Sequence, residues 1–334
     1  MRYGSVCSGI EAATAAWHQL GWEPSFFSEI EEFPRAVLSH HYPSTPLHGD
    51  FTTIEANDYE PIRLLVGGTP CQSFSVAGLR AGLDDERGNL SLEFIRLAQR
   101  LAPDWIVWEN VPGVLSSNGG RDFGAFLGAL AHLGYGFAYR VLDAQYFGVA
   151  QRRRRVFVIG YRGDWRRAAA VLFEPESLCR NTPPSRETPK DIAPTVVAGP
   201  PFSRTGNERV ECEAYIPTTA HCLQTTCHDY SRADGFNMMA FGSTMSEPDA
   251  HKEMVSTLRS NAPPAMASRN AVRRLTPTEC ERLQGFPDGY TNVPYRGKPE
   301  APDTQRYKAI GNSMAVPVMR WIGERIQLVD SLGE

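Results

Sequence analysis

Short apolar runs alternate with amphipathic stretches through the first 160 residues of the chain. The apolar runs predict strands, and they cover residues 3–6, 25–28, 64–66, 105–108 and 156–159. The stretches between them carry apolar residues at helical spacing, and they cover residues 11–20, 33–40, 92–101 and 123–133. This alternation is typical of βαβ units, and it predicts an α/β fold with a doubly wound, Rossmann-like sheet.

The alternation stops between about residues 174 and 270, where prolines, threonines and asparagines separate short irregular apolar pieces. Helical spacing returns at residues 278–283 and 313–328. We therefore expect one large domain formed by residues 1–172 and 300–334, and a smaller, loop-rich domain formed by residues 173–299.

Charge differs between parts of the chain, although the formal net charge is only −4. Residues 1–150 hold nine basic and 17 acidic side chains, whereas residues 151–190 hold ten basic and four acidic ones. This asymmetry favours an acidic domain joined to a segment that faces a polyanion, and the alternative is a solvated charged surface. No apolar run reaches the length of a membrane span, and the seven cysteines have no framework spacing. We expect a cytoplasmic protein that does not bind membranes.

A cysteine follows the apolar run 64–66 in the segment Gly67-Gly68-Thr69-Pro70-Cys71. Open α/β sheets carry their chemistry beyond the carboxyl ends of the strands, and glycines there allow close approach of backbone and ligand. Cys71 is therefore a candidate nucleophile. The alternative is a small buried hydrophobe, which is the usual role of a free cysteine.

Cofactor-binding chemistry is suggested by the turn that follows the first predicted strand, Cys7-Ser8-Gly9-Ile10-Glu11. Backbone N–H groups in such a turn can hold a ligand. Glu29 follows Gly9 by 20 residues, at the end of the second strand, where a carboxylate can bind ribose hydroxyls. Asp50 and Phe51 would add a carboxylate and a ring to the same crevice. The alternative for both acids is surface charge.

A further carboxylate, Glu109, follows the predicted strand 105–108. That strand is expected to lie beside the one that leads to Cys71, so the two side chains would face one cleft. Glu109 would then be placed to hold and donate a proton. The alternative is a glutamate that caps the following turn.

These segments resemble motifs of the DNA cytosine-5 methyltransferase family, in the order in which that family has them. The motifs are Pro70-Cys71-Gln72, Glu109-Asn110-Val111 and the Gln-x-Arg-x-Arg pattern of Gln151 to Arg155. Further matches are Arg273 to Cys280, Gln284 to Pro287 and Gly311-Asn312-Ser313. The resemblance covers residues 1–161 and 272–323.

The resemblance implies transfer of a methyl group from S-adenosylmethionine to C5 of a flipped-out cytosine in a specific sequence of double-stranded DNA. Cys71 would add to C6 of the base, and Glu109 would protonate or hydrogen-bond N3 and hold the exocyclic amino group. Arg153 and Arg155 would hold O2 of the base and the nearby backbone. Residues 173–299 would then be a target-recognition domain.

The resemblance also implies ligand contacts. Those to the cofactor are Cys7, Ser8, Gly9, Ile10, Glu11, Glu29, Ile30, Asp50, Phe51, Gly68, Pro70, Leu90, Asn312 and Ser313. Those to DNA are Gln72, Ser73, Arg80, Arg87 and Arg273, and residues 72–89 match the family's mobile catalytic loop. Glu11 departs from the family pattern, and it would either bond the methionine ammonium or face solvent. Ile30 would offer adenine an apolar face.

No metal is expected. Five potential ligands, Cys212, His221, Cys222, Cys227 and His228, lie close in sequence but match no common zinc spacing. We expect a monomer, and the family context suggests a restriction endonuclease that acts on the same site without a stable complex. The alternatives are methylation of RNA cytosine, a catalytically silent DNA-binding regulator of the same fold, and a nicotinamide-dependent oxidoreductase, which would leave the cysteine and arginine motifs unexplained.

Overall fold

The computed structural model describes residues 1–70, 90–173, 240–242, 264–268 and 271–332. Its main sheet has seven strands in the order β3-β2-β1-β4-β5-β7-β6. The strands are β1 (Arg2–Val6), β2 (Glu23–Ser28), β3 (Leu47–His48), β4 (Leu64–Gly67), β5 (Trp105–Asn110), β6 (Tyr135–Asp143) and β7 (Arg154–Arg162). The first five in sequence are parallel, and β7 runs antiparallel to both β5 and β6.

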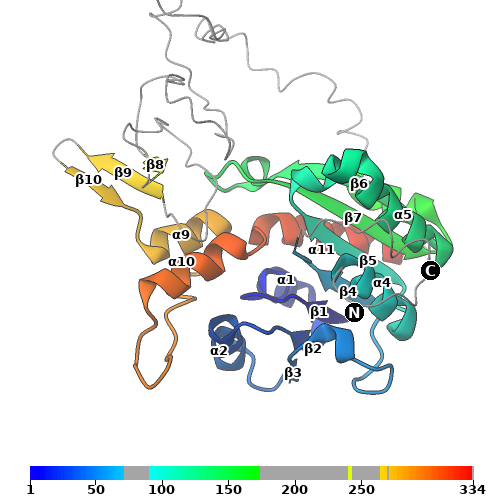
Figure 1. The fold of residues 1–334 in the computed structure, drawn as a ribbon, viewed down its shortest axis with the longest axis horizontal. Coiled ribbons are helices and arrows are strands. Elements are labelled where there is room, and N and C mark those ends of the chain that lie inside the picture. The colour runs from blue at the N-terminus through cyan, green and yellow to red at the C-terminus, as the bar shows by residue number, and fades with distance from the viewer. Residues whose placement is uncertain (71–89, 174–239, 243–263, 269–270, 333–334) are drawn as a thin grey trace, which may run out of the picture.

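Helices cover both faces of this sheet (Figure 1). The described helices are α1 (Ala12–Trp17), α2 (Glu32–His41), α4 (Leu90–Leu101), α5 (Arg121–His132), α6 (Trp165–Leu172), α9 (Pro277–Gln284), α10 (Asp303–Asn312) and α11 (Val316–Ser331), and of these α9 and α10 lie beside the small sheet described below. Successive strand residues point to opposite faces, so Trp105 and Val107 join the core that includes α1, α6 and α11. Ile106 and Trp108 join the core that includes α4 and α5. The predicted α/β fold with a doubly wound, Rossmann-like sheet is confirmed.

A small antiparallel sheet lies beside α9 and α10, apart from the main sheet (Figure 1). Its strands are β8 (Ala240–Gly242), β9 (Pro264–Ser268) and β10 (Ala271–Arg274), and β10 leads directly into α9. From Leu275 onward the chain packs into the main core, because Phe286 and Tyr290 are buried against it. The boundaries of the expected domain 173–299 stay a prediction. Among the described helices, none combines the length and apolar character needed to cross a membrane.

Candidate active site and cofactor cavity

A cavity of about 470 Å³ opens at the carboxyl ends of the parallel strands. It brings together ten of the expected cofactor contacts, which are Cys7, Gly9, Glu29, Ile30, Asp50, Phe51, Gly68, Pro70, Leu90 and Asn312. The same cavity is lined by Glu109, Arg153 and Arg155. A smaller hollow of about 40 Å³ shares part of this lining and adds Ser8, Glu11 and Ser313. Ile10 lines neither space, because its side chain is fully buried in the core.

Several expected site residues lie outside the described part of the chain. These are the expected nucleophile Cys71 and the expected DNA contacts Gln72, Ser73, Arg80 and Arg87. Arg273 belongs to β10, of which only the backbone is described. The five metal-ligand candidates between 212 and 228 also lie outside it. Within the described residues, no group of three or more histidine, cysteine or carboxylate side chains is placed to hold a metal ion.

The Glu29 side chain links the segments that follow β1 and β2. Its carboxylate accepts hydrogen bonds from the backbone N–H of Gly9, Ile30 and Glu31, each at 2.8 Å. A carboxylate has about four acceptor positions, so one remains for a further donor such as a ribose hydroxyl. The side chain is therefore fixed in orientation before any ligand binds.

Ile30 is an apolar side chain that lines the cavity while 73% of it is exposed. A flat apolar group bound in the cavity would cover it, and the hydrophobic effect would favour that contact. Asp50 and Phe51 line the cavity as well. The Asp50 carboxylate caps the short turn that Phe51 begins, by accepting from the N–H of Thr52 at 3.0 Å.

Glu11 is buried, so the alternative that it faces solvent is wrong. Its backbone is left-handed, and its carboxylate caps α1 by accepting from the N–H of Thr14 at 3.2 Å. The Ser5 hydroxyl donates to the same carboxylate at 2.8 Å. Burial raises the pKa of Glu11 to about 7, and these hydrogen bonds only partly oppose that rise. A contact between Glu11 and a methionine ammonium stays a prediction.

Cys7 is a thiol that lines this cavity. Burial raises the pKa of its thiol to about 12, and the nearby Glu29 and Asp50 add to the effect. The reactive form of cysteine is the thiolate, and a raised pKa disfavours that form near neutral pH.

Glu109 and Arg155 meet in the cavity because β5 and β7 are paired there. The Arg155 Nε lies 3.0 Å from Glu109 Oε1, and both side chains are mostly buried. Such a charge-assisted contact fixes the orientation of the carboxylate. The pair places a carboxyl group and a fork of N–H donors side by side at the wall of the cavity.

The Arg153 side chain binds backbone carbonyl groups rather than another side chain. It is 3% exposed, and its guanidinium donates to the carbonyls of Gly311 (3.2 Å) and Ser313 (2.7 Å). Burial lowers its pKa, with the charge of Arg155 adding to the effect, but the pKa of about 9 leaves it charged at neutral pH. Arg153 therefore positions the segment that carries Asn312, and its expected contact with the base stays a prediction.

The segment that leads to Cys71 is held by side chains from β5. Asn110 donates to the Thr69 carbonyl at 3.0 Å, and the Trp108 indole donates to the Thr69 hydroxyl at 2.9 Å. A Cβ at Gly68 would lie 3.0 Å from Glu109 Oε2, so glycine there leaves room for the carboxylate. Gly67 instead makes room for core side chains, because a Cβ there would lie 2.8 Å from Val6 Cγ2.

Apart from Asn312, the sequence did not predict the contribution of α10 to the cavity. Gln305, Lys308 and Ala309 line it together with Asn312, from one face of this helix. Lys308, Ala309 and Asn312 follow Gln305 by three, four and seven positions, which is the spacing of one helix face. That spacing predicts a shared face only if residues 303–312 are first recognised as a helix.

Comparisons with known proteins show the family to which the chain is similar. The model of the family described as C-5 cytosine-specific DNA methylase matches residues 1–328. A relative from Escherichia phage P1, named DNA N-6-adenine-methyltransferase, is 36% identical over 466 residues. That alignment covers 97% of this chain and 61% of the relative, so the chain spans less than two thirds of the relative's length.

Two further similarities bear on function and fold. The Type II methyltransferase M2.BsuMI of Bacillus subtilis (strain 168) is 28% identical over 332 residues, covering 98% of this chain and 75% of the relative. The crystal structure of S. pombe Dnmt2 methyltransferase superposes with a TM-score of 0.59 at 15% identity, with all of both chains covered. This structural likeness concerns the fold alone.

Proposed function

The chain belongs to the C-5 cytosine-specific DNA methylase family, and on that premise we propose that it methylates C5 of a flipped-out cytosine through a covalent Cys71 adduct. The observation that carries the proposal is the Glu109–Arg155 pair in the cavity, 3.0 Å apart and next to the strand end that leads to Cys71. Cytosine C5 is a weak nucleophile, so an enzyme must first raise its electron density.

The Cys71 thiolate would add to C6 of the cytosine, which turns the ring into an enamine-like nucleophile. The carboxylic acid form of Glu109 would donate its proton or a hydrogen bond to N3, which neutralises the charge that develops on the ring. Arg155 would hold Glu109 in place and donate to O2. After transfer of the methyl group, loss of the C5 proton to a base would release Cys71.

S-adenosylmethionine would supply the methyl group, and the residues of the cavity fit it. Glu29 retains acceptor capacity for a ribose hydroxyl, and Ile30 offers an exposed apolar face to adenine. Asp50, Phe51 and Asn312 complete this wall of the cavity. We assign the cofactor to this end and the base to the end beside Glu109.

Double-stranded DNA is the proposed substrate. Gln72, Ser73, Arg80, Arg87 and Arg273 are proposed DNA contacts, and the sequence-reading residues are proposed to lie within about residues 174–270. The chain is proposed to act in the cytoplasm as a monomer.

The test is to incubate the protein with S-adenosylmethionine and a random-sequence duplex library that contains 5-fluorocytosine. Fluorine at C5 cannot leave as a proton does, so the Cys71 adduct should be trapped and visible as a protein–DNA band. Cys71→Ser should abolish the band, and sequencing of the trapped DNA should give the target site. Absence of any adduct, with methyl transfer to ordinary duplex DNA still present, would overturn the covalent route.

The name of the phage relative raises a second candidate, methylation at N6 of adenine. Attack by an exocyclic amino group needs no thiolate adduct, so that reaction would leave Cys71 without a role. Digesting the methylated DNA to nucleosides separates the two: we expect 5-methylcytosine, and N6-methyladenine would support the alternative. The same assay on RNA tests RNA cytosine as a substrate.

A further inference from the structure

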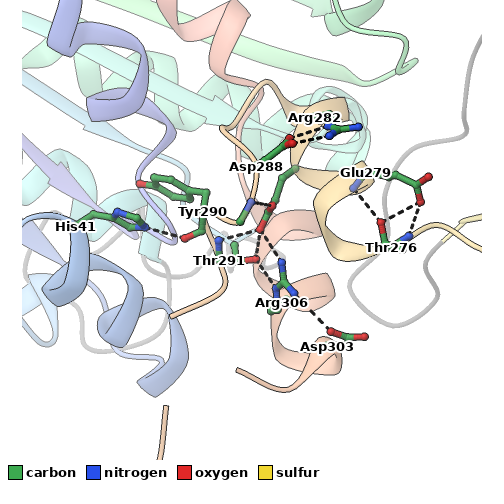
Figure 2. Close-up of polar contacts among 11 residues, drawn as sticks. His41, Thr276, Glu279, Arg282, Asp288, Tyr290, Thr291, Asp303 and Arg306 are labelled. Carbon is green, nitrogen blue, oxygen red and sulfur yellow. Dashed lines mark hydrogen bonds and ion pairs between the residues drawn. The ribbon is translucent and has the colours of Figure 1, made fainter. Parts of the chain in front are cut away.

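Helix α10 is anchored on one face by a buried ion pair. The Arg306 guanidinium donates to Glu281 at 3.2 Å and to the Thr291 hydroxyl at 3.0 Å. Figure 2 shows Arg306 and Thr291 directed toward each other. Glu281 is fully buried and also accepts from the backbone N–H of Gly289 and Thr291, at 2.7 and 2.8 Å. These contacts fix α10 against the loop that follows α9.

The other face of α10 lines the cofactor cavity, and from it Lys308 reaches across to the loop before α2. The Lys308 Nζ lies 2.7 Å from the Glu31 Oε2, and both residues line the cavity. The backbone N–H of Glu31 donates to Glu29, so the same short loop holds the carboxylate assigned to the ribose. The ion pair therefore joins two walls of the cavity.

We propose that Lys308 and Glu31 are positioning residues for the cofactor, which hold the Glu29 loop against α10 and slow cofactor release. The inference rests on the proposed function in one respect, that the cavity binds S-adenosylmethionine. The pair is about half exposed, with 43% and 44% of the two side chains accessible. Partly exposed pairs contribute up to about 1 kcal/mol, so we expect effects of about two- to fivefold on affinity.

A direct effect of charge on the cofactor predicts a different result. S-adenosylmethionine carries a sulfonium cation, whereas S-adenosylhomocysteine carries a neutral sulfur. If the side chains acted only through their charge, Lys308→Met would tighten binding of the cation and Glu31→Gln would weaken it. If the ion pair acts as a link, both variants weaken binding, and they weaken it equally for both ligands.

The chain offers a matched control in the ion pair between Arg296 and Glu32. This pair joins the loop before α10 to α2, and so it links nearly the same two parts of the chain as the Lys308–Glu31 pair does. Neither Arg296 nor Glu32 lines the cavity. Glu32→Gln and Arg296→Met therefore remove a comparable surface ion pair without touching the proposed site.

The experiment measures the Kd of both ligands by titration calorimetry and their dissociation rates by stopped-flow displacement. We expect Lys308→Met and Glu31→Gln each to raise Kd and the dissociation rate about two- to fivefold, and the exchange Lys308→Glu with Glu31→Lys to restore most of the loss. About 1 M salt should shrink the effect, because exposed charges are then screened. Single-turnover transfer at saturating cofactor should keep its rate.

The inference is overturned if these variants bind as the Glu32→Gln control does, or if they shift the two ligands in opposite directions. It is also overturned if the charge exchange restores nothing. Failure of the unmodified protein to bind S-adenosylmethionine would instead overturn the proposed function.

Discussion

Arg155 Nε lies 3.0 Å from Glu109 Oε1, across the boundary between the parallel strand β5 and the antiparallel strand β7. The two side chains are 16% and 12% exposed, so water screens their attraction only weakly. The reversed direction of β7 allows this contact, because the amino-terminal end of β7 lies beside the carboxyl-terminal end of β5. Arg155, near the start of β7, can thus form an ion pair with Glu109, near the end of β5.

Arg155→Met should lower the single-turnover rate of methyl transfer by about 100-fold or more, because the carboxylate loses its orientation and the base loses a donor. The rate is measured at saturating DNA and cofactor. Arg154→Met is the control, since Arg154 is the exposed neighbour in the same strand, and it should change this rate little. Transfer by Arg155→Met at the unmodified rate would contradict the role.

Asn110→Ala should slow transfer by about 10- to 100-fold while S-adenosylmethionine binds within about twofold of normal. The Asn110 amide donates to the Thr69 carbonyl at 3.0 Å, two residues before Cys71. Loss of this hydrogen bond should therefore make the position of the nucleophile less well defined. Calorimetry and single-turnover kinetics separate the two effects. Asn110→Asp keeps an acceptor for the N–H of Val111 but loses the donor, and it should slow transfer as well. A higher Kd for the cofactor with an unchanged rate of methyl transfer would contradict the role of Asn110 in positioning Cys71.

Glu11 should make the free energy of unfolding fall as pH rises. Its pKa is about 7 in the folded protein, above the ordinary value of 4.5, so the native state holds a proton that the unfolded chain releases. Between pH 5 and 8 this amounts to a loss of about 2 to 3 kcal/mol, complete above pH 7 and absent well below pH 4.5. Urea unfolding of the protein and of Glu11→Gln at both pH values gives the difference. Parallel pH profiles would contradict the prediction.

Arg306→Met should lower the free energy of unfolding by about 3 to 5 kcal/mol, because it leaves the Glu281 carboxylate buried without its cation. Asp303→Asn provides the control. Asp303 approaches the same guanidinium at 3.6 Å but is 65% exposed, so its loss should cost less than about 1 kcal/mol. Urea denaturation measures both. A small cost for Arg306→Met would mean that the backbone donors alone stabilise Glu281.

The main strands could be predicted from the sequence because they are buried on both faces, which makes continuous apolar runs such as residues 105–108. Strand β6 was not predicted. It lies at the sheet edge, mixes Gly136 and Arg140 with apolar residues, and forms through its pairing with β7. Helix α10 was missed for another reason, since it lies between a buried ion pair and a cavity and has no apolar stripe.

The location of the site could be predicted because the carboxyl ends of parallel strands meet at one edge. The partners of individual side chains could not. Arg153 donates to Ser313, 160 residues away, and no local spacing encodes such a contact. The burial of Glu11 could not be predicted either. A carboxylate at the start of a helix is usually exposed, and only the packing of the surrounding chain buries this one.

Helix α11 covers α1, and the Trp17 indole donates to the Met319 carbonyl at 2.7 Å, 302 residues away in sequence. The contact is close, because a Cβ at Gly323 would lie 2.5 Å from the Trp17 ring. During synthesis α1 leaves the ribosome long before α11 exists. Trp17 and its neighbours therefore stay uncovered by α11 on the nascent chain, and this face of the core closes only after α11 has been made.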